Sequence, residues 1–212
     1  MNEVTFTQED FDVFKLEGLD TRMTAIRGQI QPKFKALATE FAQELASDLQ
    51  EEEPLHVHIA QHIRRTKNAP NDTWCAIGGD KRGYKKYPHF QLGIYANHLF
   101  IWLAMIDNPQ AEKESATSLL TQLDFFAKLP KDYVVSLDHH FPKTTPVSEI
   151  DLKKGLERFR DVKKGEFLIG REIWSDDTLL EDPAATQAFI LETYRTLLPI
   201  YQTAMEAQKK VK

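Results

Sequence analysis

The first 49 residues carry a hydrophobic pattern with the period of a helix. Thr7 and Asp10 are three residues apart, the spacing of a capping box that begins a short helix. Across residues 18–49, apolar side chains recur every three or four positions and define one stripe: Leu19, Met23, Ile26, Ile30, Phe34, Leu37, Phe41, Leu45 and Leu49. Because Pro32 cannot donate a helical hydrogen bond, we expect a kinked helix or two helices that meet near Gln31.

The pattern then changes to the period of two that is typical of strands. It predicts four strands, at residues 55–60, 73–77, 87–95 and 98–106. The third alternates throughout, with apolar residues on one side and His89, Gln91 and Gly93 on the other. The fourth is apolar on both faces, as in a central strand covered on each side. The short connections favour antiparallel neighbours.

The second half mixes helices and strands. We predict a helix over residues 107–129, a strand at 133–137, a loop containing Pro142 and Pro146, a helix at 151–163, a strand at 166–174 and a last helix from Pro183. Helices and strands do not alternate strictly enough for a doubly wound parallel sheet. The pattern therefore predicts a single α+β domain over residues 1–212, with a twisted, mainly antiparallel sheet of about five or six strands packed with long helices.

Composition narrows the class of protein. Charged residues make up 28% and apolar residues 42% of the chain, as in ordinary globular proteins. The single cysteine, Cys75, excludes an internal disulfide framework and suits a reducing compartment. The N-terminus lacks a signal-peptide pattern, and the longest apolar run, residues 99–106, is too short to cross a bilayer. We therefore expect a cytoplasmic protein with no membrane partner.

A basic segment stands out against the net charge of −5. Residues 64–86 hold seven Lys and Arg and only two Asp, so the segment carries about +5 while Trp74, Tyr84 and Tyr87 interleave it. Guanidinium groups suit phosphate or carboxylate, and aromatic rings can stack on a base. We predict an anion site, although the same charges also fit two solvated loops; its expected residues are Arg64, Arg65, Asn71, Trp74, Arg82, Tyr84, His62 and His89.

Histidines provide the second signal. His56 and His58 have His-x-His spacing, and Asp138, His139 and His140 can add ligands at a strand end. No ligand set closes from spacing alone, so we predict no bound metal and no cofactor. The Walker, G-x-G-x-x-G and G-x-S-x-G motifs are absent from the sequence. Glu166, Arg171 and Glu172 are interpreted as ion-pair formers and Cys75 as a core residue, which leaves the catalytic residues unassigned.

Three functions fit these features. The first is a binding module for an anionic ligand, either a nucleotide-like small molecule or a short nucleic acid. The second is a hydrolase or transferase acting on a phosphorylated substrate, with His58, His62 or His89 as the acid–base group. The third is an interaction protein whose basic face contacts an acidic partner. A concave pocket favours the first two and a flat face the third. The sequence leaves the oligomeric state open.

Long ungapped motifs carry a family resemblance. The segments "HIAQHIRRTKNAPNDTW" and "RGYKKYPHFQLGIYANHLFIW" resemble the YktB-like family of uncharacterised bacterial proteins. The opening "FTQEDFDVF", then "EGLDTRM" and "IQPKF", and later "SLDHH" resemble the same family, so the likeness covers most of the chain. The resemblance implies a soluble bacterial α+β protein and brings no activity or catalytic residue with it.

Overall fold

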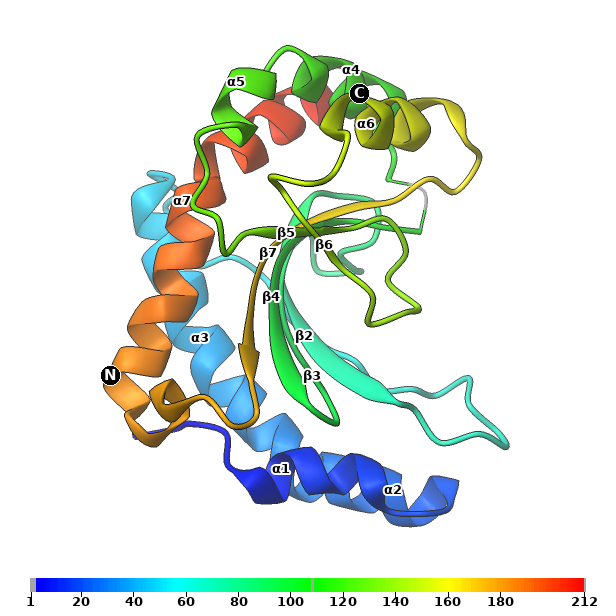
Figure 1. Ribbon diagram of the computed structural model, residues 1–212, viewed down its shortest axis with the longest axis vertical. Helices are drawn as coiled ribbons and strands as arrows, with labels where there is room; N and C mark the ends of the chain where they lie inside the picture. The colour runs from blue at the N-terminus through cyan, green and yellow to red at the C-terminus, as the bar shows by residue number, and fades with distance from the viewer. Residues whose placement is uncertain (1–2, 108, 212) are drawn as a thin grey trace. The chain divides into compact units, whose positions relative to one another are not determined.

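Seven strands form one sheet in the computed structural model, which describes residues 3–107 and 109–211 (Figure 1). Their order is β1-β2-β3-β4-β7-β5-β6. They span β1 Val57–Ile59, β2 Asp72–Gly78, β3 His89–Tyr95, β4 His98–Met105, β5 Val134–Ser136, β6 Thr145–Pro146 and β7 Phe167–Trp174. Pairing is antiparallel between β1 and β2, β5 and β6, and β5 and β7. The predicted α+β class is confirmed, with slightly more strands than expected.

The first helix, α1 (Gln8–Asp12), begins at the predicted capping box. The backbone N–H of Thr7 donates to the Asp10 carboxylate at 2.7 Å. This bond satisfies a backbone N–H at the helix N-terminus that has no acceptor within the helix. Asp10 is fully buried and also accepts hydrogen bonds from Gln29 at 3.2 Å and Lys33 at 2.5 Å. One carboxylate therefore caps the helix and ties it to the helical segments that follow.

Pro32 coincides with a change in helix type. The chain runs from α2 (Leu19–Ala25) through a π-helical turn (Ile26–Ile30) into α3 (Gln31–Asp48). Pro32 lies in the first turn of α3, where a missing N–H costs little, so the junction near Gln31 is confirmed. The middle of the predicted stripe is buried: Met23, Ile26, Ile30, Phe34, Leu37, Phe41 and Leu45.

The two strands at the middle of the sequence are covered on both faces. Every residue of β4 is buried, as the apolar run predicted. In β3 the predicted alternation between an apolar and a polar side is wrong as a guide to burial, because His89 and Gln91 are as inaccessible as their apolar neighbours. The Tyr84 ring packs on His89, so a polar side chain in a strand does not by itself identify a solvent-exposed face.

The second half departs from the prediction in two places. Within the range predicted as one helix, 107–129, there are two shorter helices, α4 (Glu112–Leu120) and α5 (Leu123–Phe126), while Asn108, at the predicted start, lies outside the described residues. The Thr121 hydroxyl donates to the Ser118 carbonyl at 2.7 Å, a local bond that competes with helix continuation. β6 occupies part of the predicted Pro142–Pro146 loop; as a two-residue last strand it tolerates Pro146.

The remaining α-helices are α6 (Leu152–Asp161) and α7 (Pro183–Lys210). α6 begins at Asp151, whose carboxylate accepts the Lys154 N–H at 3.0 Å. α7 starts with proline, as predicted, and continues through Pro199. Within the described part of the chain, no helix is long and apolar enough to span a bilayer.

The described chain divides into two compact units. The first comprises residues up to 77 with 91–101 and 172–192, and the second comprises 78–90, 102–171 and the residues from 193 onward. In the first, α3 packs against β1; in the second, α4 lies beside α6 (Figure 1). Also in the second, the Phe90 ring lies 5.0 Å from that of Tyr194 and 4.9 Å from that of Tyr201. A single domain over residues 1–212 stays a prediction.

Candidate functional site

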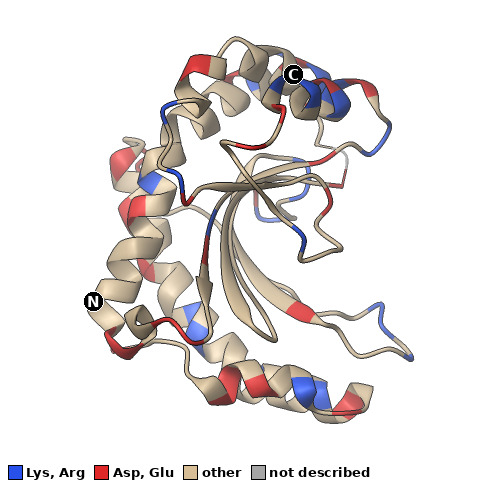
Figure 2. Cartoon of the chain, in the orientation of Figure 1, with Lys and Arg blue, Asp and Glu red and all other residues tan. Residues whose placement is uncertain are grey.

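The eight residues predicted to bind an anion fall in both compact units. Arg64, Arg65 and Arg82 all have exposed side chains. In Figure 2, Lys and Arg, drawn in blue, lie on the loop that precedes β2. The first unit holds His62, Arg64, Arg65, Asn71 and Trp74, and the second holds Arg82, Tyr84 and His89. The proximity of Arg64 to Arg82 stays a prediction.

His62 lies where the chain has left β1. Its φ of 50° breaks the extended conformation, so the parity that it shares in sequence with His56 and His58 does not carry over to one strand face. Its Nε2 is 3.0 Å from the Thr73 hydroxyl, and its ring meets Trp74 edge-on with centroids 5.7 Å apart. The imidazole therefore fixes the loop against the start of β2.

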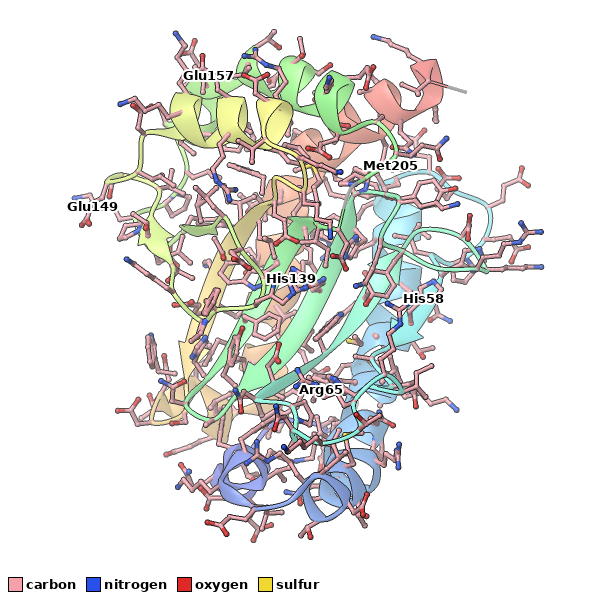
Figure 3. All side chains as sticks on the ribbon, turned by 90° about the vertical axis from the view of Figure 1, so that its right-hand side faces the viewer. His58, Arg65, His139, Glu149, Glu157 and Met205 are labelled. Atoms are coloured by element: carbon pink, nitrogen blue, oxygen red, sulfur yellow. The ribbon has the colours of Figure 1, made fainter. Side chains whose placement is uncertain are left out.

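Positive charge converges on this histidine from two elements. Burial, with smaller contributions from the charges of Arg65 and Arg27, lowers the pKa of His62 to about 4. Arg65, labelled in Figure 3, belongs to the loop between β1 and β2, and Arg27 belongs to the π-helical turn. At neutral pH the site therefore pairs two guanidinium groups with an uncharged imidazole.

The lowered pKa of His62 predicts a pH-dependent stability. Between pH 6.5 and about 4, His62 is protonated in the unfolded chain but stays neutral in the folded chain. The free energy of unfolding should therefore fall as the pH falls through this window. Allowing for partial exposure, we expect a loss of about 1–2 kcal/mol. His62→Asn should flatten the dependence, as measured by urea unfolding at pH 7 and pH 4.5. Identical pH dependence in both proteins would contradict the assignment.

Asn71 has a structural role at the other end of the loop. The Arg22 guanidinium donates to the Pro70 carbonyl at 2.9 Å and to the Asn71 side-chain oxygen at 3.4 Å. The same side chain also donates twice to the Leu16 carbonyl, at 2.7 and 3.0 Å. Arg22 thus anchors the loop, which holds Asn71 in place and leaves Arg64 and Arg65 on the exposed stretch between the anchors.

In the second unit, Arg82 belongs to a tight turn. The Asp80 carboxylate accepts the backbone N–H of Arg82 at 2.7 Å, that of Gly83 at 3.1 Å, and the Tyr87 hydroxyl at 2.9 Å. A side chain on Gly79, with φ of 78°, would meet the Gly83 carbonyl oxygen at 2.5 Å. This turn needs glycine for its shape and carries the Arg82 side chain outward to solvent.

His89 is enclosed. Its side chain has no exposed surface, its Nδ1 lies 2.8 Å from the Tyr87 carbonyl oxygen and therefore donates, and the Tyr84 ring covers it at a centroid distance of 4.7 Å. The donor predicted here for a ligand is used inside the protein, and Tyr84 packs on the histidine. Cys75 is also enclosed, and burial raises the pKa of its thiol to about 12, as expected of an inert core residue.

A second polar cluster lies after β5. The β5–β7 register pairs Val134 with Gly170 and Ser136 with Leu168, and continuing it by two residues brings Asp138 opposite Glu166. With His139 and His140, these carboxylates each offer one ligand atom, and the four atoms lie within 4.8 Å of one another. The sequence indicated three members of this set. It missed the role of Glu166, which is remote in the chain and comes close only through the strand register.

Hydrogen bonds hold the cluster in place. Glu166 accepts the backbone N–H of His139 at 2.8 Å and that of Asp107 at 3.2 Å, and both its oxygens lie 2.8 Å from His139 Nδ1. Burial alone would raise the pKa of Glu166, but the interactions with His139 and the backbone hydrogen bond from Asp107 together keep the pKa below its usual range. Asp138 accepts the backbone N–H of His140 at 3.0 Å and lies 2.9 Å from its Nδ1.

The cluster adjoins an open pocket of about 390 Å³. Asp138 contributes to its lining, Lys143 and Arg158 bring positive charge, and Phe141 is 63% exposed beside it. The Arg158 guanidinium also donates to the Leu137 carbonyl at 3.2 Å, which ties α6 to the end of β5. The pocket thus combines apolar walls with charged groups of both signs.

Comparison with known proteins identifies the family. A family model described as "Domain of unknown function (DUF1054)" matches residues 6–201. A UPF0637 protein of Enterococcus faecalis is 52% identical over 200 residues, covering 94% of this chain and 98% of the relative. The chain belongs to the UPF0637 family. UPF0637 proteins of Shouchella clausii and Oceanobacillus iheyensis are each 47% identical to this chain. The first match covers 95% of this chain and 95% of the relative, and the second covers 96% of this chain and 98% of the relative.

Membership in the UPF0637 family confirms the resemblance seen in the sequence motifs. The family description states that the function is unknown, and the names of these bacterial relatives state no activity. Function must therefore be argued from the geometry of the residues themselves.

Proposed function

We propose that this UPF0637 protein is a cytoplasmic binding module for an anionic, phosphate-bearing ligand, either nucleotide-like or a short nucleic-acid segment. The observation that carries the proposal is that Arg64 and Arg65 are exposed on a loop that hydrogen bonds hold at both ends, beside an imidazole that stays neutral at neutral pH. A ligand phosphate would gain charge-assisted hydrogen bonds from the guanidinium groups without a competing carboxylate on that loop.

The surrounding structure supports a prepared surface. The loop is held at one end by His62 on Thr73 and at the other by Arg22 on Pro70 and Asn71, so ordering it on binding costs less entropy. Trp74 lies beside His62 and is only partly covered, which gives a base a ring to stack on. Arg82, in the second unit, stays a predicted ligand-binding residue that its own variant tests.

Binding is favoured over acid–base catalysis by the histidines. With a pKa near 4, His62 is a weak base and is scarcely protonated at neutral pH, so it is a poor general acid there. His89 is buried with its Nδ1 engaged. Two of the three histidines considered for catalysis therefore suit positioning better than proton transfer.

Arg65→Ala and Arg82→Ala should each weaken phosphate-bearing ligands about ten- to a hundredfold, because each removes a charge-assisted hydrogen bond worth roughly 1.5–3 kcal/mol. Binding of nucleotides, phosphosugars and a short single-stranded DNA can be measured by NMR titration, and affinity should fall as salt rises. Lys35→Ala, an exposed cation on α3, is the matched control and should bind like the wild type.

The proposal fails if none of these ligands binds, or if the affinity of both arginine variants equals that of the Lys35→Ala control. Binding to an acidic protein in the absence of small-ligand binding would instead support an interaction module with a basic face. Arg82→Ala alone losing affinity would place the site on the Asp80–Gly83 turn rather than on the loop before β2.

A further inference from the structure

We propose that Asp138, His139, His140 and Glu166 form a binding site for a divalent transition-metal ion. Their four ligand atoms lie within 4.8 Å of one another. Ligands at about 2.0–2.2 Å from a zinc-like ion are separated by roughly 3.3–4.4 Å. Small side-chain rotations therefore suffice to close the set. The expectation that the chain binds no metal rested on an incomplete ligand set, and the strand register supplies the missing member.

The arrangement is more than two ion pairs. Separate pairs would account for the 2.8 Å contact of His139 with Glu166 and the 2.9 Å contact of His140 with Asp138. Two independent ion pairs would not need to lie next to each other. The His139 and His140 rings are nevertheless in contact, with centroids 3.9 Å apart and an interplanar angle of 39°. Two imidazoles that lie against each other between two carboxylates can share a single cation with them.

Backbone groups prepare the set. Glu166 accepts the backbone N–H groups of His139 and Asp107, and Asp138 accepts that of His140. These donors remain in place when the imidazoles turn from the carboxylates to a metal, and they orient the ligating oxygens in the way outer-shell hydrogen bonds do in metal sites. The ligands therefore start from a fixed backbone frame.

The donor atoms favour certain ions. Two imidazole nitrogens with two carboxylate oxygens suit zinc, manganese, iron, cobalt or nickel, while calcium and magnesium prefer oxygen ligands alone. The environment is also acidic: the Asp107 carboxylate lies near both histidines, with Lys85 as its ion-pair partner. Because Lys85 offsets the charge of Asp107, the attraction for a dication comes from the Asp138 and Glu166 carboxylates.

The site has a buried and an open side. The Glu166 and His139 side chains are 7% and 13% exposed, whereas those of Asp138 and His140 are 47% and 66% exposed. Asp138 also lines the pocket that contains Lys143 and Arg158. A bound ion would therefore keep one side toward solvent, where water or an anionic group can complete its coordination.

The test uses the untagged full chain, stripped with chelator and dialysed. Titration with Zn²⁺ and Co²⁺ should give one saturable site per chain, and Co²⁺ should develop visible absorption bands that report imidazole and carboxylate ligation; Mg²⁺ and Ca²⁺ should bind at least tenfold more weakly. Glu166→Gln and His139→Ala should each lower the affinity at least tenfold. His140→Ala should do the same and keep the fold, because that side chain is mostly exposed.

Two control variants are available in the chain. Glu149→Gln changes an exposed carboxylate outside the cluster, and the His56→Ala, His58→Ala double variant removes the His-x-His pair. Both should bind like the wild type. The proposal is overturned if the wild type shows no stoichiometric site, or if the His140→Ala variant, folded by circular dichroism, binds unchanged. Arg65→Ala should leave metal binding intact, so this result and the anion-binding result can fail separately.

Discussion

Replacing Ile101 with Asp is expected to leave no folded protein. Ile101 has no exposed surface and lies in β4, where every residue is buried. An unpaired carboxylate there, together with the lost apolar contacts, costs at least several kcal/mol, which is comparable to the roughly 5–15 kcal/mol that stabilises a typical domain. Circular dichroism and size-exclusion chromatography of the purified variant provide the measurement.

Ile63 supplies the matched control. It is 86% exposed on the loop after β1, so Ile63→Asp makes the same chemical change in water and should alter stability by no more than about 0.5 kcal/mol. A soluble Ile101→Asp protein with native circular dichroism and an unchanged melting temperature would disprove the assignment of β4 as the buried central strand.

The Gly93→Ala variant should lose about 3 kcal/mol or more. A methyl group on Gly93 would lie 1.9–2.5 Å from three carbons of the Phe100 ring, which is itself only 4% exposed. Atoms cannot approach so closely, so the ring or the strand must move, and overpacking of this kind typically costs about 1–3 kcal/mol and sometimes more. Urea unfolding of the variant should show a lower midpoint with an unchanged slope.

Two further variants make this test specific. Gly28→Ala adds the same methyl group where no atom lies within 4 Å, so it should be neutral or slightly stabilising in its helical turn. Phe100→Ala removes the ring that clashes with the new methyl group but leaves a cavity. The double variant should therefore lose less stability than the sum of the losses in the two single variants. If the double variant loses as much unfolding free energy as the two single variants together, or more, the steric explanation is wrong.

The local features were predictable because short-range physics determines them. Thr7 and Asp10 cap α1 through hydrogen bonds between residues three apart, and Pro32 marks the start of α3, because the first turn of a helix tolerates a residue without an N–H. The burial of β4 followed from its unbroken apolar run. The exposure of Arg64 and Arg65 on a loop likewise followed from charge and turn residues.

Burial of polar residues was decided by tertiary structure. His89 and Gln91 alternate with apolar residues as a solvated face would, yet both are enclosed, because burial depends on what packs over the face of the sheet rather than on the pattern of the strand itself. The enclosure of Asp10 is similar: the sequence indicated its capping role, but Gln29 and Lys33 reach it only through packing.

The candidate sites divide in the same way. The sequence by itself determined the basic segment and the Asp138–His139–His140 run, since both are contiguous in the chain. Only the tertiary structure decided that Arg27 approaches His62 and that Glu166 joins the histidines. Partners that are remote in sequence become neighbours through helix packing and strand register, and register depends on pairing between strands, which the residues of one strand alone do not specify.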